Sequence, residues 1–306
     1  MAAILRLPAQ SAPMHALSRR QLVTLALLTL IWGLNWPIMK LGVTDFPPLT
    51  FRALSMWLSL PVLWLVLRGM RVPLGVAREH WRELFWLAFA NMFIWQGLII
   101  LAVKSLSSGR AAILGYTMPI FSAVLGALFF GNKMLPRAWA GVVAAGAGVV
   151  LLLWYEFTHL SGSPLGVMEA LVAAASWAVG TQMLRRTTLP VATLTLSFWM
   201  TALTTAVMTL LALLFETSQW KTPSGATWAA ILFNAVLVFG FAQAAWFYLA
   251  RGLPPVASTL SVMLTPILGV FSGAVWLHEV LHWQDWTAVV LMVAAIGSVL
   301  APARKT

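Results

Sequence analysis

The chain has 306 residues, of which 61% are hydrophobic and only 9% are charged, and its mean hydropathy is +0.89. A soluble domain of this length needs far more polar surface, so the composition excludes an ordinary soluble protein and predicts a membrane protein. Cysteine is absent, which excludes disulfides and thiolate metal sites, and the net charge of +11 comes from basic residues scattered among short connections, so nucleic-acid binding is not expected.

Residues 1–21 contain Pro8 and Pro13 and no unbroken apolar run, so they are predicted to be a cytoplasmic tail and not a cleavable signal peptide. Ten apolar segments follow, each near the roughly 20 residues that a bilayer-spanning helix needs. In chain order the predicted spans are Leu22–Met39, Pro48–Leu67, Leu84–Val103, Ala111–Phe130, Ala138–Trp154, Pro164–Leu184, Val191–Leu214, Ala226–Ala250, Val256–Leu277 and Asp285–Ala301. Residues 303–306 form a second short tail.

Basic residues in the tails and connections orient these spans. Fourteen Lys and Arg residues fall on the side that holds both tails, and four fall on the other side, namely Lys40, Lys104, Arg110 and Lys221. Because basic connections stay in the cytoplasm, this alternation predicts ten spans in the cell inner (plasma) membrane with both termini cytoplasmic.

Three features recur at one constant offset of 147 residues: Gln96 and Gln243, Pro119 and Pro266, Trp139 and Trp286. A fixed offset across a helix pair, a proline and a loop indicates two copies of one unit. Each copy contains five spans, an odd number, so the second copy enters the membrane inverted. The sequence therefore predicts an all-α polytopic membrane protein whose ten transmembrane helices form an inverted 5+5 repeat, with copies at residues 22–155 and 156–302.

Amides beside tryptophans are the first candidates for contact with a transported solute. Asn91 lies four residues before Trp95 and Gln96 directly follows that tryptophan, while Gln243 and Trp246 are three residues apart, so each group occupies adjoining parts of a helix face. A solute stripped of water at the midplane needs such polar partners. The alternative interpretation is that the amides only bridge helices, which contributes about 0.6 kcal/mol per bond in a membrane.

Five tryptophans fall at span ends, and Trp32, Trp95, Trp177 and Trp246 lie deeper than these, which are Trp81, Trp86, Trp154, Trp220 and Trp228. An aromatic wall there accepts rings or methyl groups and offers its face to an ammonium. The alternative is that they pack against neighbouring helices, because tryptophans in membrane proteins most often serve as interfacial anchors or packing residues.

Pro119 and Pro266 each remove a backbone donor within a span, which predicts paired kinks that act as hinges of a gate or only as packing kinks. Arg52 and Glu169 are ionisable residues inside spans, about one turn from the outer face. Either they extend to water, or Glu169 is a proton or cation site and Arg52 a gate or a partner for a carboxylate. With no acidic residue near the midplane, a facilitator or exchanger stays open beside a proton-coupled carrier.

A different class of protein is raised by His278-Glu279-Val-Leu-His282, which matches the H-E-x-x-H zinc motif and would make the chain an intramembrane metalloprotease. The motif falls where a span ends, and the sequence offers no obvious third ligand. We therefore expect no metal and no enzyme activity. No G-x-x-x-x-G-K-[ST] motif is present, so no nucleotide cofactor is expected and any driving force must come from gradients.

Several stretches resemble the drug/metabolite transporter superfamily and its ten-helix EamA-type branch. They are Trp32-Gly33-Leu-Asn35-Trp36-Pro37 with Lys40, Pro48 with Arg52, Ala111-Ala112 through Pro119, Ser258-Thr259 through Pro266, and Glu279 followed by Trp286. Where the family often places Gly-Glu, the first repeat has Gly131-Asn132, so only Glu279 can take that acidic role. The chain is most similar to bacterial exporters of aromatic and other neutral amino acids. The resemblance implies a central cavity lined by spans one to four and six to nine, and it brings Asn35 and Tyr116 into the candidate substrate-binding set.

The sequence-based hypothesis is a secondary transporter that exports small neutral amino acids, aromatic and other apolar ones, or related metabolites by alternating access. Phosphorylated sugars or nucleotides would require clustered basic residues within the membrane, and only Arg52 is available. The alternative is efflux of hydrophobic drugs or quaternary cations. The expected partners are a small-molecule substrate and the lipid bilayer. The fifth and tenth spans carry small residues at a spacing that suits either a monomer or a homodimer, namely Ala140, Ala144, Gly148, Ala294 and Ser298.

Overall fold

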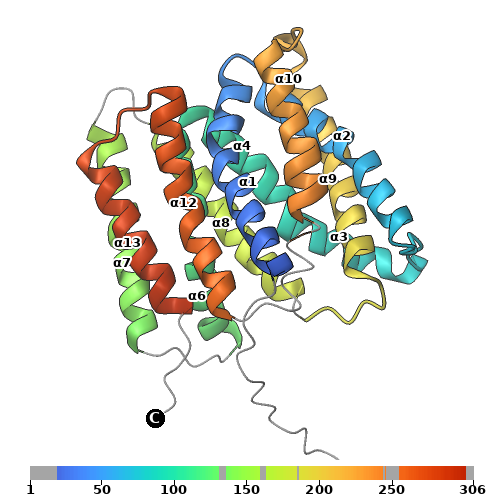
Figure 1. Cartoon of the computed structure of the whole chain (residues 1–306), viewed down its shortest axis with the longest axis horizontal. Helices are drawn as coiled ribbons and strands as arrows, with labels where there is room; N and C mark the ends of the chain where they lie inside the picture. Colours follow the sequence, from blue (N-terminus) through green and yellow to red (C-terminus); the bar gives the residue numbers. More distant parts are fainter. Residues whose placement is uncertain are drawn as a thin grey trace, which may run out of the picture.

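The structure is a computed structural model that describes residues 19–130, 136–158, 163–184, 186–243, 245 and 255–300. Within these ranges the regular structure is entirely helical, and eight helices are long and apolar enough to cross a membrane, with a shorter apolar helix at Leu264–Leu277. Helix α1 begins and helix α13 ends at the same end of the bundle (Figure 1). The chain is thus an all-α polytopic membrane protein, as the sequence predicts.

The helices follow the ten predicted spans in order. They are α1 (Arg19–Thr44), α2 (Pro48–Gly69), α3 (Trp81–Ala88) continuing through a π-helical segment η2 (Phe89–Phe93) into α4 (Ile94–Ser105), α5 (Ser108–Gly115) and α6 (Met118–Phe130), α7 (Pro136–Thr158), α8 (Pro164–Leu184), α9 (Thr193–Phe215), α10 (Gly225–Leu232) continuing into π-helical η4 (Phe233–Ala242), α12 (Pro255–Leu277) and α13 (Trp283–Leu300). Short 3-10 turns lie at Arg78–His80 and Thr217–Gln219.

Local sequence explains where several of these helices begin. Helices α2, α7, α8 and α12 each start at a proline, namely Pro48, Pro136, Pro164 and Pro255. The missing N–H of proline is not needed in the first turn, and its fixed φ suits a helix start. Helices α5 and α10 instead begin after Ser107 and Ser224, whose hydroxyls each accept a hydrogen bond from a backbone N–H of the first turn.

The two copies pack as an inverted repeat. Helix α7 lies against α13, and α2 lies against α9, so each of these spans contacts its own repeat counterpart. The contact of α1 with α12 is matched by that of α8 with α5 and α6, and the contact of α8 with α4 and η2 is matched by that of α1 with α10 and η4. Such reciprocal pairing is what a two-fold relation between the copies produces, and with five spans in each copy the second copy is inverted.

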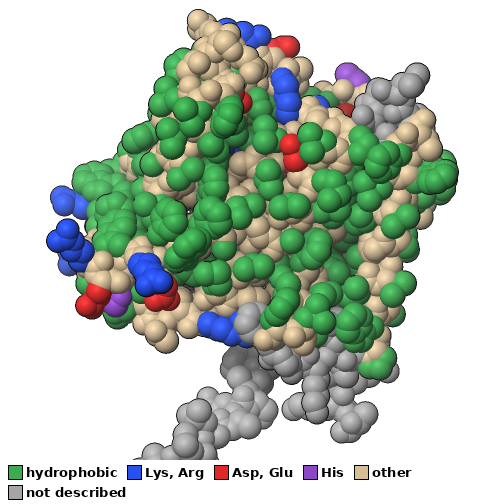
Figure 2. Space-filling view, turned by 180° about the vertical axis from the view of Figure 1, so that it is seen from behind, with side chains coloured by type: hydrophobic (Ala, Val, Ile, Leu, Met, Phe, Trp, Pro, Cys, Tyr) green, Lys and Arg blue, Asp and Glu red, His purple; other side chains and the backbone are tan. Residues whose placement is uncertain are grey.

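The lipid-facing surface is apolar. Figure 2 shows hydrophobic side chains over most of one face, with charged side chains gathered near its two ends. Large exposed side chains include Leu65, Val143, Leu214, Phe215 and Val290. In water such a surface would aggregate, whereas in a bilayer it matches the acyl chains.

Spans three and eight share a second repeat feature. The π-helical segments η2 and η4 occupy equivalent positions, because an offset of 147 residues places Phe89–Phe93 inside Phe233–Ala242. π-helical turns inside helices are rare and frequently mark functional sites. Segment η4 contributes Val238 and Phe239 to the central cavity described below, and η2 directly precedes α4, which carries Trp95 and Gln96 into it.

Spans four and nine differ, although both contain the repeated proline. Helix α5 ends at Gly115, Tyr116 and Thr117 are not helical, and α6 starts at Met118 directly before Pro119. Helix α12 continues through Pro266. The paired kinks expected from the sequence are therefore unequal in this structure, and only span four is divided into two separate helices.

Small residues of α7 and α13 pack against each other within this one chain. A Cβ added to Gly141 would lie 1.9 Å from Ser298 Oγ, and one added to Gly148 would lie 3.6 Å from Ala288 Cα. The small-residue faces of the fifth and tenth spans are thus at least partly used inside the monomer, and a homodimer through them stays a prediction.

Candidate functional site

A cavity of about 90 Å³ lies at the centre of the bundle. Its lining comes from α1, α2, α4, η4, α8 and the interrupted span four, and consists of Trp32, Asn35, Trp36, Met39, Arg52, Trp95, Gln96, Ile99, Tyr116, Met118, Trp177, Val238, Phe239 and Gln243. Helices α7 and α13 contribute no described lining residue. The cavity therefore brings together seven of the nine residues that the sequence proposes for substrate contact.

Aromatic rings form two walls of this cavity. The Trp36 and Tyr116 rings meet edge to face with centroids 6.2 Å apart, and the Trp95 and Trp177 rings lie 5.2 Å apart in a tilted arrangement. Glycine makes room for Trp36, because a Cβ at Gly115 would lie 2.7 Å from its Cη2. These walls can accept an apolar side chain or the face of a cation.

Arg52 is the main electrostatic feature of the cavity. Its side chain is only 2% exposed, so it does not extend to the surface, and the sequence-based alternative that it reaches water is wrong. Nη2 donates to Met39 Sδ at 3.1 Å, and Nη1 lies 3.5 Å from Asn234 Oδ1. Nε has no hydrogen-bond partner among the residues described, and no ion pair found in those ranges includes this guanidinium. A buried cation that lacks an anionic partner is costly unless a ligand supplies one.

Asn35 adds an unpaired acceptor to the same cavity. Its side chain is 8% exposed, and its Oδ1 makes no hydrogen bond within the described ranges. An unsatisfied buried acceptor costs about 1–3 kcal/mol. Gln96 and Gln243, from repeat-equivalent positions, also line the cavity. The site thus offers a free cationic donor and a free neutral acceptor between aromatic walls.

Two predicted residues lie away from the cavity, and a third is not among the residues described. Asn91 is buried against α8, where its Nδ2 lies 3.5 Å from the Trp177 carbonyl, an arrangement that fits the helix-bridging alternative. Glu169 is half-buried on α8 and does not line the cavity. Trp246 lies outside the described residues.

The sequence interpretation missed six of the lining residues, among them Trp36, Met39 and Phe239. A signal for two of them was present, because Trp32, Asn35, Trp36 and Met39 recur at helical spacing and therefore share one face of α1. Phe239 had no such signal, since every residue of η4 except Asn234 is apolar or glycine and its π-helical turns alter the periodicity.

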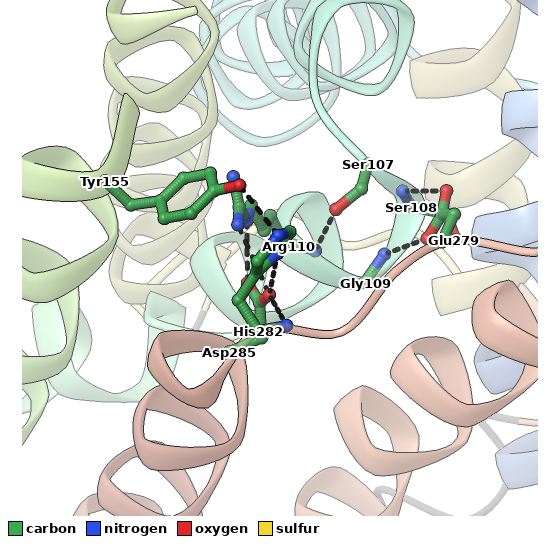
Figure 3. Close-up of polar contacts among 8 residues, drawn as sticks. All are labelled: Ser107, Ser108, Gly109, Arg110, Tyr155, Glu279, His282 and Asp285. Atoms are coloured by element: carbon green, nitrogen blue, oxygen red, sulfur yellow. Dashed lines mark hydrogen bonds and ion pairs between the residues drawn. The ribbon is translucent and has the colours of Figure 1, made fainter. Parts of the chain in front are cut away.

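One end of span four is held by a polar cluster (Figure 3), at the end of the bundle opposite the start of α1 and the end of α13 (Figure 1). The Glu279 carboxylate accepts hydrogen bonds from Ser108 N at 2.7 Å, Ser108 Oγ at 2.9 Å and Gly109 N at 3.3 Å. The two N–H groups belong to the first turn of α5 and have no partner within the helix, and the helix dipole also favours a negative charge there. Glu279 therefore fixes the start of α5, whose other end carries Tyr116 into the cavity wall.

Beside this cap lies a buried ion pair. Arg110 Nε donates to Asp285 Oδ1 at 2.6 Å and Nη2 donates to Oδ2 at 3.2 Å, while the guanidinium lies 3.8 Å from the Tyr155 ring centroid. Tyr155 Oη lies 3.0 Å from His282 Nε2, as Figure 3 shows. The cluster joins α5, α7 and the start of α13.

The zinc-motif alternative conflicts with this geometry. Helix α12 ends at Leu277, and residues 278–282 are not helical, so His278 and His282 do not share a helix face. Glu279 is already engaged by α5. Among the described residues there is no group of three or more His, Cys, Asp or Glu that could hold a metal.

Comparison with known sequences then places the chain. The EamA-like transporter family matches it twice, at residues 20–154 and 164–301. The chain belongs to this family. The two matches agree with a repeated unit, and the EamA chain is accordingly a multi-pass membrane transporter.

Individual relatives support the same assignment. This EamA protein is 27% identical to the uncharacterized transporter YoaV of Bacillus subtilis, over 82% of its own length and 87% of the relative. It is 28% identical to the uncharacterized inner membrane transporter YedA of Escherichia coli, over 90% and 91% of the two chains. It is 26% identical to a probable amino-acid metabolite efflux pump of Salmonella typhimurium, over 92% and 94%.

A solved crystal structure shares the fold. It aligns with a TM-score of 0.66 over 91% of this chain and 96% of its own, at 20% sequence identity. At that identity the likeness speaks for the fold alone.

Proposed function

We propose that this EamA protein exports small neutral amino acids across the inner membrane by alternating access. The observation that carries the proposal is Arg52, a buried guanidinium without an anionic partner in the described part of the chain, which lines the same cavity as the unpaired Oδ1 of Asn35. A zwitterionic amino acid carries the two groups that these atoms lack. The name of the Salmonella relative supports the direction of transport.

Each part of an amino acid finds a partner of matching chemistry. The carboxylate pairs with the guanidinium of Arg52, whose donors suit a bidentate contact. The ammonium donates to Asn35 Oδ1 and faces the indole rings. The side chain packs among Met39, Trp95 and Trp177. Binding in this way satisfies both buried polar atoms at once, which offsets the cost of removing the solute from water.

The size of the cavity bears on which amino acids enter. A cavity of about 150 Å³ holds benzene in a soluble protein, and this one measures about 90 Å³. We therefore expect compact substrates such as threonine to bind with little rearrangement. Aromatic substrates require Trp95 or Trp177 to move outward.

The runner-up substrate class is hydrophobic quaternary cations, which the indole faces favour. The cavity charge opposes it, because the described lining contains Arg52 and no carboxylate. A cation in this site would meet a like charge in a low dielectric.

Flux into liposomes tests the proposal. The full chain, purified and reconstituted, is offered labelled threonine, methionine, phenylalanine and a quaternary ammonium compound, with empty liposomes as control. We expect amino-acid flux that Arg52→Gln abolishes. Transport of the quaternary cation alone would eliminate the amino-acid proposal.

A further inference from the structure

A second hollow, larger than the central cavity, opens between α4 and α9 and has a volume of about 620 Å³. Its walls are apolar over most of their length and include Ile94, Gly97, Leu101 and Leu211. We call it the α4–α9 groove. It shares no described lining residue with the central cavity, because Trp95, Gln96 and Ile99 occupy the other side of α4.

The groove exists because the two repeats are packed unequally. Helix α9 lies against α3 and η2 but has few contacts with α4, whereas the equivalent pair, α2 and span eight, is packed along η4. Gly97 lies at the floor, where a Cβ would be only 3.3 Å from Met208 Cε. The exposed side chains of Leu210, Leu214 and Phe215 on α9 show that this helix borders lipid.

The dimensions of the groove match one leaflet. Its lining on span three runs from Phe93 to Lys104, which is about 16 Å of helix at 1.5 Å per residue. Half of a bilayer core of about 30 Å is about 15 Å. The lining is apolar at the deep end, and its polar members Lys104, Glu216 and Gln219 stand at the end where α4 and α9 stop.

The charged residues at the rim of the groove, Glu216 and Lys104, favour an anionic head group over a cationic one. Glu216 is occupied by α2, since its carboxylate accepts hydrogen bonds from Leu49 N at 2.9 Å, Thr50 N at 2.7 Å and Thr50 Oγ1 at 2.7 Å. The exposed Lys104 ammonium donates to the carbonyls of Val43 and Thr44. An ammonium has three N–H donors, and the contacts found in the described ranges occupy two of them. The third donor is left for an anion.

We propose that the α4–α9 groove binds a membrane phospholipid, with one acyl chain along α4 and the phosphate at Lys104. An apolar channel of one-leaflet length with a cation at its mouth fits this amphiphile. With the orientation predicted from the basic residues, the site lies in the outer leaflet. Because α4 separates the groove from the cavity, the bound chain supports the wall that carries Trp95 and Gln96.

Native mass spectrometry of the purified full chain in detergent tests the proposal, after exposure to phosphatidylglycerol and phosphatidylethanolamine. We expect one phospholipid to survive washing on the wild type. Leu101→Trp fills the groove from α4 and should remove the retained lipid. If that variant does not fold, Leu211→Trp fills the groove from α9 and should have the same effect. Leu214→Trp, on the exposed face of α9, is the matched control and should retain it.

The rim is tested separately with two lysines, Lys40 and Lys104, which both hydrogen-bond between the end of α1 and the end of α4. Lys40 Nζ donates to the Lys104 and Leu106 carbonyls and does not line the groove. Lys104→Gln should lower phosphatidylglycerol retention about fivefold, as expected for about 1 kcal/mol per basic residue near anionic lipid. Lys40→Gln should leave it unchanged. Equal retention by the wild type and both groove-filling variants, or displacement of the lipid by threonine, would overturn the proposal.

Discussion

The carboxylate of Glu279 caps the first turn of α5 through the backbone N–H and hydroxyl of Ser108, at 2.7 and 2.9 Å. The two residues are 171 positions apart and belong to different repeats. This contact ties the interrupted span four of one copy to the connection that follows span nine of the other copy. Tyr116, at the far end of α5, lines the cavity, so the cap and the cavity wall are the two ends of one short rigid helix.

Replacing Glu279 by glutamine should destabilise the protein. The change keeps the shape of the side chain but removes the charge that favours the helix start, which costs about 1 kcal/mol. Thermal unfolding in detergent measures the effect, with Glu169→Gln, at a half-buried position away from the cap, as control. Identical melting temperatures for both variants would show that the cap contributes no stability.

Arg52→Gln should affect transport and stability in opposite ways. The variant lacks the guanidinium that pairs with the carboxylate of threonine. Threonine binding should therefore weaken by about 1.5–3 kcal/mol, because a hydrogen bond to a charged group is lost. The free protein should unfold at an equal or higher temperature, since an unpaired buried charge has been removed. Binding is measured by isothermal calorimetry and stability by thermal unfolding. A marked drop in melting temperature would indicate that Arg52 serves packing and not substrate.

Trp95→Ala should change substrate preference. Removing the indole that faces Trp177 enlarges the cavity, so flux of phenylalanine should rise relative to flux of threonine. The measurement is competition between the two labelled amino acids in liposomes. Trp86→Ala, in which an exposed tryptophan on α3 outside the cavity is removed, should keep the wild-type ratio. An unchanged ratio in Trp95→Ala would exclude this side chain from the selectivity of the site.

Gly180→Ala should be strongly destabilising. A Cβ at this position would lie 2.5 Å from the Cα of Asn91, so α8 would have to move away from span three at a cost of about 1–3 kcal/mol. Gly146→Ala is the matched control, because a Cβ there meets nothing within 4 Å. Thermal unfolding compares the two. Similar melting temperatures would mean that the contact between α8 and span three is looser than the structure places it.

Sequence periodicity and hydropathy alone determined the helical content, the order of the spans and the repeat. Helix α8 begins at Pro164 and ends at Leu184, as predicted, because hydrophobic length and the preference of proline for the first turn are local properties. The offset of 147 residues also indicated that Gln96 and Gln243 occupy equivalent positions, and both side chains line the cavity.

Only the tertiary structure decided which polar residues remain unpaired. A sequence shows that Arg52 lies in a span, but its burial and its lack of an anionic partner depend on Met39, Asn234 and Phe239 from two other spans. The division of span four without a matching break at Pro266, and the groove beside α4, likewise arise from unequal packing of two similar copies. Hydropathy is a sum over neighbouring residues, so the membrane spans could be predicted from the sequence. The partners of a buried charge are set by helices brought together from distant parts of the chain, so they could not.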